Sequence, residues 1–153
     1  MGELLNKTVY GCYLLTCSAG EEINGMPLSL FLQVSFQPPV VAVGVSPKRY
    51  THKMILESGA FAVVFLRKEQ KALVERFKLK SEERSKKFEG LEWERGISGA
   101  PILKDCLGYI ECRLIAWLGF GDHTLFIGEV VKEKLLQEGE VLSVSDLGKY
   151  YAG

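Results

Sequence analysis

Short apolar runs separated by turn-forming residues dominate the chain. Residues 8–18 are rich in β-branched, aromatic and aliphatic side chains, and residues 40–45 and 60–66 are nearly continuous apolar runs. Runs of this length and composition are typical of strands, and the last two suit strands buried on both faces. Three further strand-like segments are expected around residues 107–118, 124–136 and 141–144.

Helical periodicity is confined to the middle of the chain. Leu73, Val74 and Phe77 form an apolar stripe that predicts a helix over residues 69–78. A shorter helix to about Glu57 is predicted behind Thr51 as its N-cap. Residues 67–95 carry dense charge of both signs, which indicates a solvated face or, alternatively, a docking surface.

The remaining segments supply turns. Glycines and an asparagine predict a turn over residues 19–25, and residues 29–35 are ambiguous until Pro38 and Pro39 stop any helix. Residues 119–123 suit the connection of an antiparallel hairpin. About six strands with two short helices and little βαβ alternation predict a mainly β fold, an antiparallel barrel, with a doubly wound sheet as the weaker choice.

Composition and charge narrow the class of protein. The 153 residues are 47% hydrophobic and 25% charged, which fits one folded domain over residues 1–153. Nineteen basic residues balance nineteen acidic ones, which argues against a general nucleic-acid binder. No apolar run approaches the roughly 20 residues of a membrane span, and no secretory leader is visible at the start. We therefore expect a cytoplasmic protein without nucleic-acid or membrane partners.

The four cysteines, at positions 12, 17, 106 and 112, form no closely spaced pair, and the chain has two histidines. This spacing argues against a zinc or iron–sulfur site, so no metal is expected. A disulfide is compatible with the even count, but we expect small buried thiols on strands.

The sequence lacks the glycine-rich motifs of Rossmann folds and P-loops and the nucleophile elbow of hydrolases. Three other segments are candidate sites. Residues 24–35 form an irregular strand edge that could hold a flat ring through backbone groups, or an ordinary edge strand. Residues 46–53 combine hydroxyls, cations and a helix N-terminus, as an anion site or simply a capped helix would. His123, beside Asp122 in the hairpin connection, suits proton donation, phosphate binding or a structural turn.

Taken in order, the segments resemble the flavin reductase-like family of FMN-binding split-barrel proteins, and the resemblance covers nearly the whole chain. The residues that carry it are YGCYLLT (10–16), NGMPLSLFLQVSFQPP (24–39), YTHKMI (50–55), GAFAVVFL (59–66), KFEGLEW (87–93), GAPIL (99–103), GDHTLFIGEV (121–130) and the closing LGKYYAG (147–153).

The resemblance implies a six-stranded antiparallel split barrel that forms a homodimer, with FMN, rather than FAD, bound near the subunit interface. Many members have Thr where this chain has Pro27, which removes an N–H and a hydroxyl from the flavin site. The implied flavin-lining residues are Asn24, Gly25, Ser29, Leu30, Phe31, Val34 and Ser35, and the implied phosphate-binding residues are Ser46, Arg49, Tyr50, Thr51 and His52.

The implied activity is hydride transfer from NADH or NADPH to the flavin and on to an acceptor. His123 falls in the loop that approaches the flavin's substrate side, and is the candidate catalytic residue. Two alternatives remain. One is a non-enzymatic FMN electron carrier, flavoredoxin-like, reduced by a partner such as rubredoxin or ferredoxin and docking through residues 67–95. The other is a flavinless barrel that only binds a partner.

Overall fold

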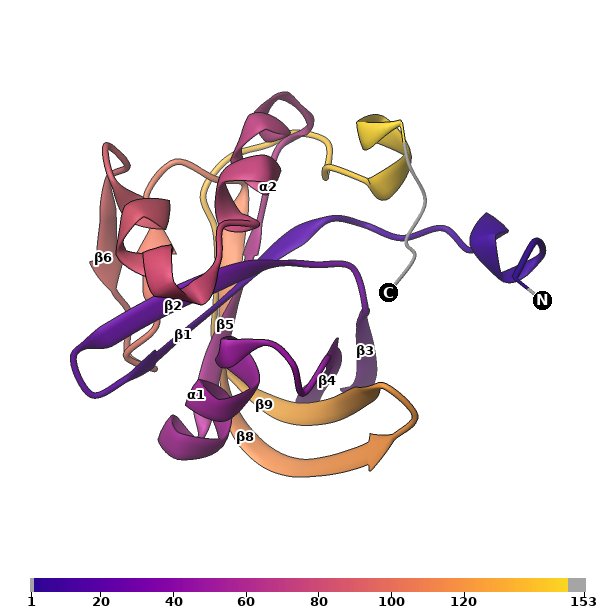
Figure 1. Ribbon diagram of the computed structural model, residues 1–153, viewed down its shortest axis with the longest axis horizontal. Helices are drawn as coiled ribbons and strands as arrows, with labels where there is room; N and C mark the ends of the chain where they lie inside the picture. Colours follow the sequence, from indigo (N-terminus) through magenta and orange to yellow (C-terminus); the bar gives the residue numbers. More distant parts are fainter. Residues whose placement is uncertain (1, 149–153) are drawn as a thin grey trace.

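The computed structural model describes residues 2–148, and these form a mainly β protein built on one antiparallel sheet of seven strands. The strand order in this sheet is β2-β1-β5-β8-β9-β4-β3, and a small second sheet pairs β6 with β7. Figure 1 shows the large sheet curling around the middle of the molecule, with α2 near its upper end and α1 near its lower end in this view. The predicted fold class, mainly β and antiparallel, is confirmed.

The bounds of the elements are as follows. The strands are β1 (Tyr13–Ala19), β2 (Glu22–Leu28), β3 (Phe31–Phe36), β4 (Pro39–Val45), β5 (Ala60–Phe65), β6 (Trp93–Arg95), β7 (Pro101–Leu103), β8 (Gly108–Phe120) and β9 (His123–Leu135). The helices are α1 (Tyr50–Ser58) and α2 (Ala72–Phe77), with 3-10 turns η1 (Leu5–Lys7), η2 (Lys68–Gln70), η3 (Ser81–Phe88) and η4 (Val144–Leu147).

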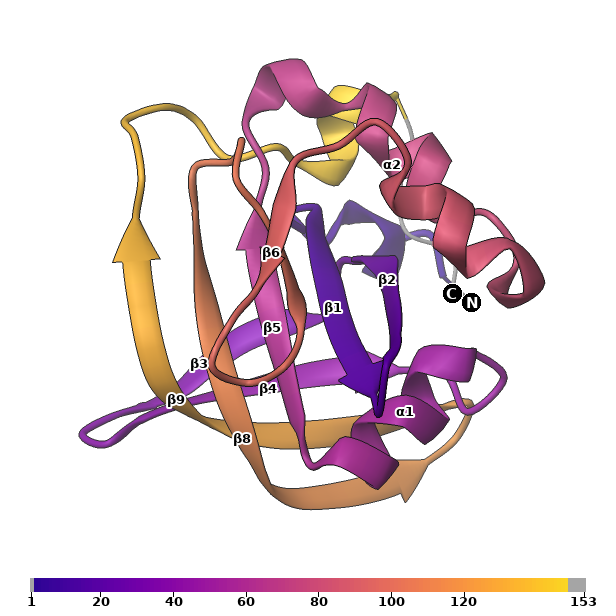
Figure 2. The same cartoon turned by 90° about the vertical axis from the view of Figure 1, so that its left-hand side faces the viewer.

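The curvature of the sheet comes from β8 and β9, its two longest strands. Their pairing shifts register between Glu111 and Cys112 and between Leu114 and Ala116, and such bulges bend a strand pair. As a result β8 pairs with β5 through its first half, while β9 pairs with β4 near the hairpin turn. Figure 2 shows both strands bending sharply, with β3 and β4 passing behind β1 and β5.

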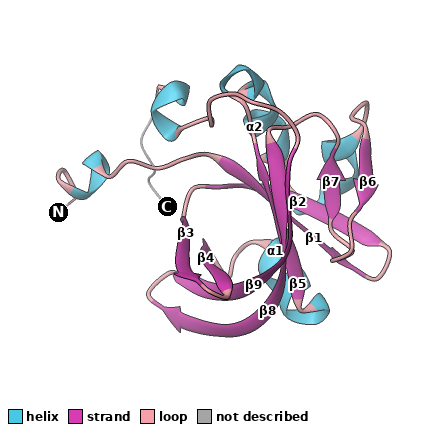
Figure 3. Cartoon of the chain, turned by 180° about the vertical axis from the view of Figure 1, so that it is seen from behind, coloured by secondary structure: helices cyan, strands magenta, loops and turns pink. Residues whose placement is uncertain are grey.

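The sheet buries an apolar cluster on each face. One cluster packs β1 and β5 against α2 and the β6–β7 hairpin, which lies to one side of the sheet in Figure 3. The other packs β1, β4, β5 and β9 against α1 through Met54 and Ile55. Cys12 belongs to the first cluster and Cys17 to the second, so the two thiols face opposite sides of the sheet. All four thiols are free and buried, as expected, but Cys12 and Cys106 lie outside the strands predicted to carry them.

The structure corrects several predicted elements. Residues 22–28, assigned mainly to a turn, form β2, so the main sheet has seven strands where the sequence predicts six. The predicted helix over 69–78 divides into η2 and α2, and residues 141–144 make two isolated bridges and no strand. Among the described residues, no helix has the length and apolar character that crossing a membrane requires.

Candidate functional site

A cleft of about 470 Å³ opens between the start of α1 and the segment that links α2 to η3; we call it the cationic cleft. Of the described residues that line it, six are Lys or Arg and one is acidic. Such an excess focuses positive potential in a concave site and favours an anionic ligand. The lining residues are Asn24, Met26, Pro47, Lys48, Arg49, Tyr50, Thr51, Lys53, Phe77, Lys78, Leu79, Lys80, Ser81, Glu82 and Lys87.

The α1 N-terminus supplies backbone donors to the cleft. Arg49 takes the N-cap position, no described side chain caps the helix, and its first turn has no acidic residue. The first backbone N–H groups of a helix lack intrahelical partners and attract anions. Thr51, predicted as the N-cap, lies inside the helix and its Oγ1 donates to Met26 Sδ at 2.9 Å. That prediction is wrong because the chain turns into the helix two residues earlier, after Pro47 and Lys48.

Tyr50 is held at the rim of the cleft by a charged cluster. Its hydroxyl donates to Glu22 Oε2 at 3.4 Å, and the Arg84 guanidinium stacks 4.8 Å from the centre of its ring. Arg84 also pairs with Glu22 at 2.9 Å. Because β2, α1 and η3 each contribute one of these side chains, the cluster ties the two walls of the cleft to the sheet edge.

Lys87 is the one buried cation of the cleft among the described residues, with 3% of its surface exposed. Its Nζ donates to Asn24 Oδ1 at 2.9 Å and to the Gly25 carbonyl at 2.7 Å. Burial, together with the nearby charge of Arg49, lowers the pKa of Lys87 to about 8. Sequence reasoning missed this residue, because it lies in a charged run interpreted as solvated.

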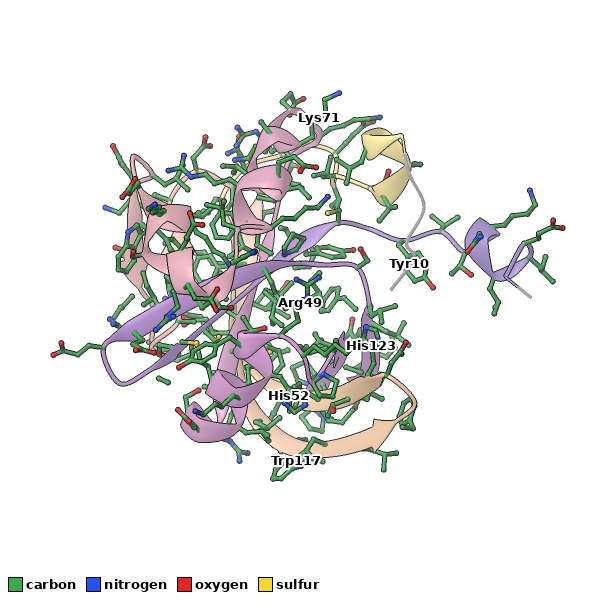
Figure 4. All side chains as sticks on the ribbon, viewed as in Figure 1. Tyr10, Arg49, His52, Lys71, Trp117 and His123 are labelled. Atoms are coloured by element: carbon green, nitrogen blue, oxygen red, sulfur yellow. The ribbon has the colours of Figure 1, made fainter. Side chains whose placement is uncertain are left out.

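His52 and His123 lie outside the lining of the cleft, and His52 is hydrogen-bonded to the residue that follows His123. His52 Nε2 hydrogen-bonds Thr124 Oγ1 at 2.8 Å, and its ring packs 5.0 Å from that of Phe126. Burial lowers the pKa of His52. His123 precedes Thr124 at the start of β9, and its Nδ1 lies 2.8 Å from Asp122 Oδ1, which lowers the pKa of Asp122. Figure 4 shows Arg49, His52 and His123 between α1 and β3, far from Lys71.

Of the twelve residues implied to bind the flavin, Asn24, Arg49, Tyr50 and Thr51 line the cationic cleft, and Gly25 reaches Lys87 through its carbonyl. The other seven implied residues do not line the cleft. Ser46 Oγ accepts from the Lys48 N–H at 3.3 Å, so its hydroxyl faces its own turn. Leu30 is placed beside the end of β4, since its carbonyl accepts from the Gly44 N–H at 2.9 Å.

Phe31 and Val34 differ in their surroundings. Phe31 packs edge-on against Tyr13, with ring centres 4.9 Å apart, and also contacts Phe65. Val34 is exposed, and Ser35 uses its carbonyl to accept from Gln33. Ser29 accepts the Phe31 N–H through its carbonyl. Five of the implied flavin-lining residues thus form a second group on β3 and just before it, and the structure does not bring this β3 group into the cationic cleft. The β3 group consists of Ser29, Leu30, Phe31, Val34 and Ser35.

A curled antiparallel sheet with a cationic cleft at a helix N-terminus defines a β protein built to hold an anionic ligand. The flavin reductase like domain model matches residues 5–147, and the chain belongs to this family.

Named relatives cover most of the chain. It is 31% identical over 146 residues to a ferric-chelate reductase (NAD(P)H) of Archaeoglobus fulgidus, covering 94% of this chain and 86% of that protein. It is 30% identical to a high molecular weight rubredoxin of Moorella thermoacetica, covering 91% of this chain but 62% of that protein. Among solved structures, it is similar to the NADH:FAD oxidoreductase SgcE6 of Streptomyces globisporus C-1027 in complex with NAD and FAD fragments. That match has a TM-score of 0.85 and 27% identity, and covers 98% of this chain and 88% of the other.

Proposed function

We propose that this protein is an NAD(P)H-dependent flavin reductase that holds FMN in the cationic cleft. The observation that carries the proposal is the convergence of an uncapped helix N-terminus and six basic side chains on one concave site. The names of the archaeal ferric-chelate reductase and of SgcE6 support a reduced nicotinamide as the electron donor.

The residues of the cleft fit a phosphorylated flavin. A volume of about 470 Å³ lies within the usual range for small-molecule sites. Within the described part of the chain, the buried amide nitrogen of Asn24 has no hydrogen-bond partner, as a donor awaiting a ligand acceptor would have none. The basic side chains match a phosphate rather than a neutral substrate.

Each wall of the cleft has a distinct task in this proposal. Arg49 and the first amides of α1 bind the phosphate, and the Tyr50–Glu22–Arg84 cluster keeps that helix end in place. The wall formed by residues 77–82 shields the ligand from water. When bound, a flavin would supply the hydride-accepting chemistry of the reaction. The β3 group, which the resemblance implies as support of the flavin ring, lies outside the cleft, so it would contact only a part of the ligand that extends beyond it.

A visible spectrum of the purified protein with FMN, followed by anaerobic addition of NADH and then NADPH, tests the proposal. Protein-bound flavin that bleaches promptly with either nucleotide supports a reductase. A protein that leaves added FMN free in solution overturns the proposed function.

We also propose that His123 acts on the electron donor or acceptor rather than on FMN retention, because it stands at the hairpin turn and does not line the cleft. His123→Ala should leave the FMN dissociation constant unchanged and slow flavin reduction or reoxidation about tenfold or more. Stopped-flow absorbance of the two half-reactions measures this effect. Wild-type rates in both would make His123 a structural residue of the turn.

An electron carrier is the second candidate, favoured by the similarity to a rubredoxin-bearing protein. A carrier would bind FMN but resist reduction by either nicotinamide nucleotide, and a reduced rubredoxin would reduce it. In the charged segment proposed to dock the partner, Arg84 and Lys87 are already engaged with Glu22 and Asn24. Docking would therefore use the outward-facing lysines of that segment, and their exchange should abolish the salt dependence of electron transfer.

The exposed apolar side chains of the sheet support a homodimer. Among the described strands, β2 and β3 end the strand order of the main sheet. Large apolar side chains are exposed on β3 and on the second half of β8, including Phe36 at 81% and Trp117 at 58%, and Trp117 points away from the body in Figure 4. Exposed apolar groups of this size are typical of an interface.

We expect Trp117→Ser to weaken this dimer at least tenfold. Analytical ultracentrifugation over a concentration series measures the change, with exposed Lys71→Ser as the control. A wild-type monomer at high concentration would contradict the dimer. The four free buried thiols further support a reducing compartment, and we propose the cytoplasm.

A further inference from the structure

Asn24 is the most buried polar residue that lines the cationic cleft, with 1% of its surface exposed. Its Oδ1 accepts two hydrogen bonds, from Lys87 Nζ at 2.9 Å and from the Gly25 N–H at 2.8 Å. Its Nδ2 is buried and has no partner in the described chain. The side chain is therefore half satisfied, although buried amides are ordinarily paired on both atoms.

The two donors fix which way the amide faces. Turning it over would place an NH₂ group against both the Lys87 ammonium and the Gly25 N–H, which are donors themselves. The Gly25 donor is a backbone group, whereas the Lys87 donor is a side chain. Lys87 belongs to η3, on the opposite wall of the cleft from α1. Lys87 Nζ also donates a second hydrogen bond, to the Gly25 carbonyl at 2.7 Å.

Asn24 and the helix N-terminus present separate donors. Met26, two residues after Asn24 on the same strand, contacts Thr51 of α1 through its sulfur. Residues at i and i+2 share one face of a strand and lie roughly 6–7 Å apart. The amide of Asn24 therefore stands further along the cleft from the start of α1, where a second part of one ligand would reach it.

We propose that Lys87 is a positioning residue that holds Asn24 with its amide nitrogen presented to the cleft, and that this nitrogen donates a hydrogen bond to an acceptor oxygen or nitrogen of the bound flavin. The inference rests on the proposed function and deepens it, because it assigns the ligand a contact on β2 distinct from the phosphate contact on α1.

The first test compares FMN dissociation constants, measured by quenching of flavin fluorescence. Asn24→Asp keeps the shape of the side chain and an acceptor for Lys87 but loses the amide donor, and Asn24→Ala removes both. Each should weaken FMN binding about tenfold, the value of one hydrogen bond of about 1.4 kcal/mol. Urea unfolding of each ligand-free variant shows that the folded fraction is the one titrated.

The second test is a double-mutant cycle. If Lys87 acts through Asn24, Lys87→Met should also weaken FMN binding about tenfold, and the Asn24→Ala/Lys87→Met protein should bind no worse than the weaker single variant. Lys80→Met is the matched control, because it removes an exposed cation from the same cleft. The fold-loss of FMN affinity caused by Lys80→Met should multiply with that of Asn24→Ala in the corresponding double variant.

Three outcomes overturn the inference. Wild-type affinity in folded Asn24→Asp and Asn24→Ala would remove the donor role, even if Lys87→Met failed to fold. Multiplying losses in the cycle would mean that Lys87 contacts the ligand itself. A wild-type protein that does not bind FMN would remove the proposed function and this inference together, whereas the first two outcomes leave the proposed function standing.

Discussion

Arg49 occupies the N-cap of α1 and lines the cationic cleft, with a β-region backbone that leaves its side chain beside the first helical amides. Arg49→Ala should weaken FMN binding about tenfold, because a charge-assisted bond to a phosphate contributes roughly 1.5–3 kcal/mol. Riboflavin, which lacks the phosphate, should bind both proteins equally. Lys71→Ala, which changes an exposed cation outside the cleft, is the control for fluorescence titration. An equal loss of riboflavin affinity would place Arg49 elsewhere on the ligand.

Single residues show where sequence reasoning reaches its limit. Three implied ligands, Arg49, Tyr50 and Thr51, do line one cleft, because a short motif around a helix start keeps its residues together in space. Thr51 has the residue type of an N-cap, yet its hydroxyl turns to Met26, a contact that depends on how β2 packs against α1. Lys87 is 63 positions from Asn24, and no periodicity links two polar residues across that distance.

Glu111 on β8 anchors the β6–β7 hairpin, and this contact is testable. Its carboxylate is fully buried and accepts from the N–H groups of Ile97 and Ser98 and from the Ser98 hydroxyl. Glu111→Gln turns one acceptor into a donor facing donors, so the free energy of unfolding should fall by about 1–3 kcal/mol. Urea denaturation measures the change, and Glu94→Gln, exposed on β6 of the same hairpin, should differ little from wild type. Equal stability of the two variants would refute the anchoring role.

At the scale of elements, strands made of long apolar runs were predictable and β2 was not. Asn24 and Gly25 are turn formers by type, but here they lie inside an edge strand paired with Cys17 and Thr16. A Cβ at Gly25 would lie 2.9 Å from the Phe77 ring, so the glycine serves close packing rather than a turn. The extended conformation of Gly25 is therefore set by residues that contact it in the fold, and not by its neighbours in the sequence.

Stability at alkaline pH is a property of the whole molecule, because the titrating groups are spread over both cores. Burial raises the pKa of Cys12 and Cys106 to about 11 and that of Cys17 and Cys112 to about 12, from 9.0. The folded protein therefore keeps thiol protons that the unfolded chain releases above pH 9, and stability falls there. Lys87 acts in the opposite sense, since its pKa of about 8 lies below 10.5 and the unfolded chain binds the extra proton.

The expected profile of unfolding free energy against pH is therefore nearly flat up to about pH 8 and falls above it, where four thiols outweigh one lysine. Urea denaturation under reducing conditions at half-unit steps measures it. Lys87→Met should make the fall above pH 8 steeper, and Cys112→Ala should make it shallower by up to about 1.4 kcal/mol per pH unit. A profile that is flat between pH 8 and 11 would contradict both assignments.

The unpaired amide nitrogen of Asn24 also has a consequence for how this chain evolves. A buried donor without a partner costs a folded protein about 1–3 kcal/mol, so selection for stability alone would favour a side chain that keeps the acceptor for Lys87 and lacks the unpaired N–H, such as Asp. The asparagine is retained only while a ligand compensates for its unpaired N–H. A related protein that no longer binds the ligand could gain stability by a substitution at position 24. Such a substitution would indicate that ligand binding had been lost.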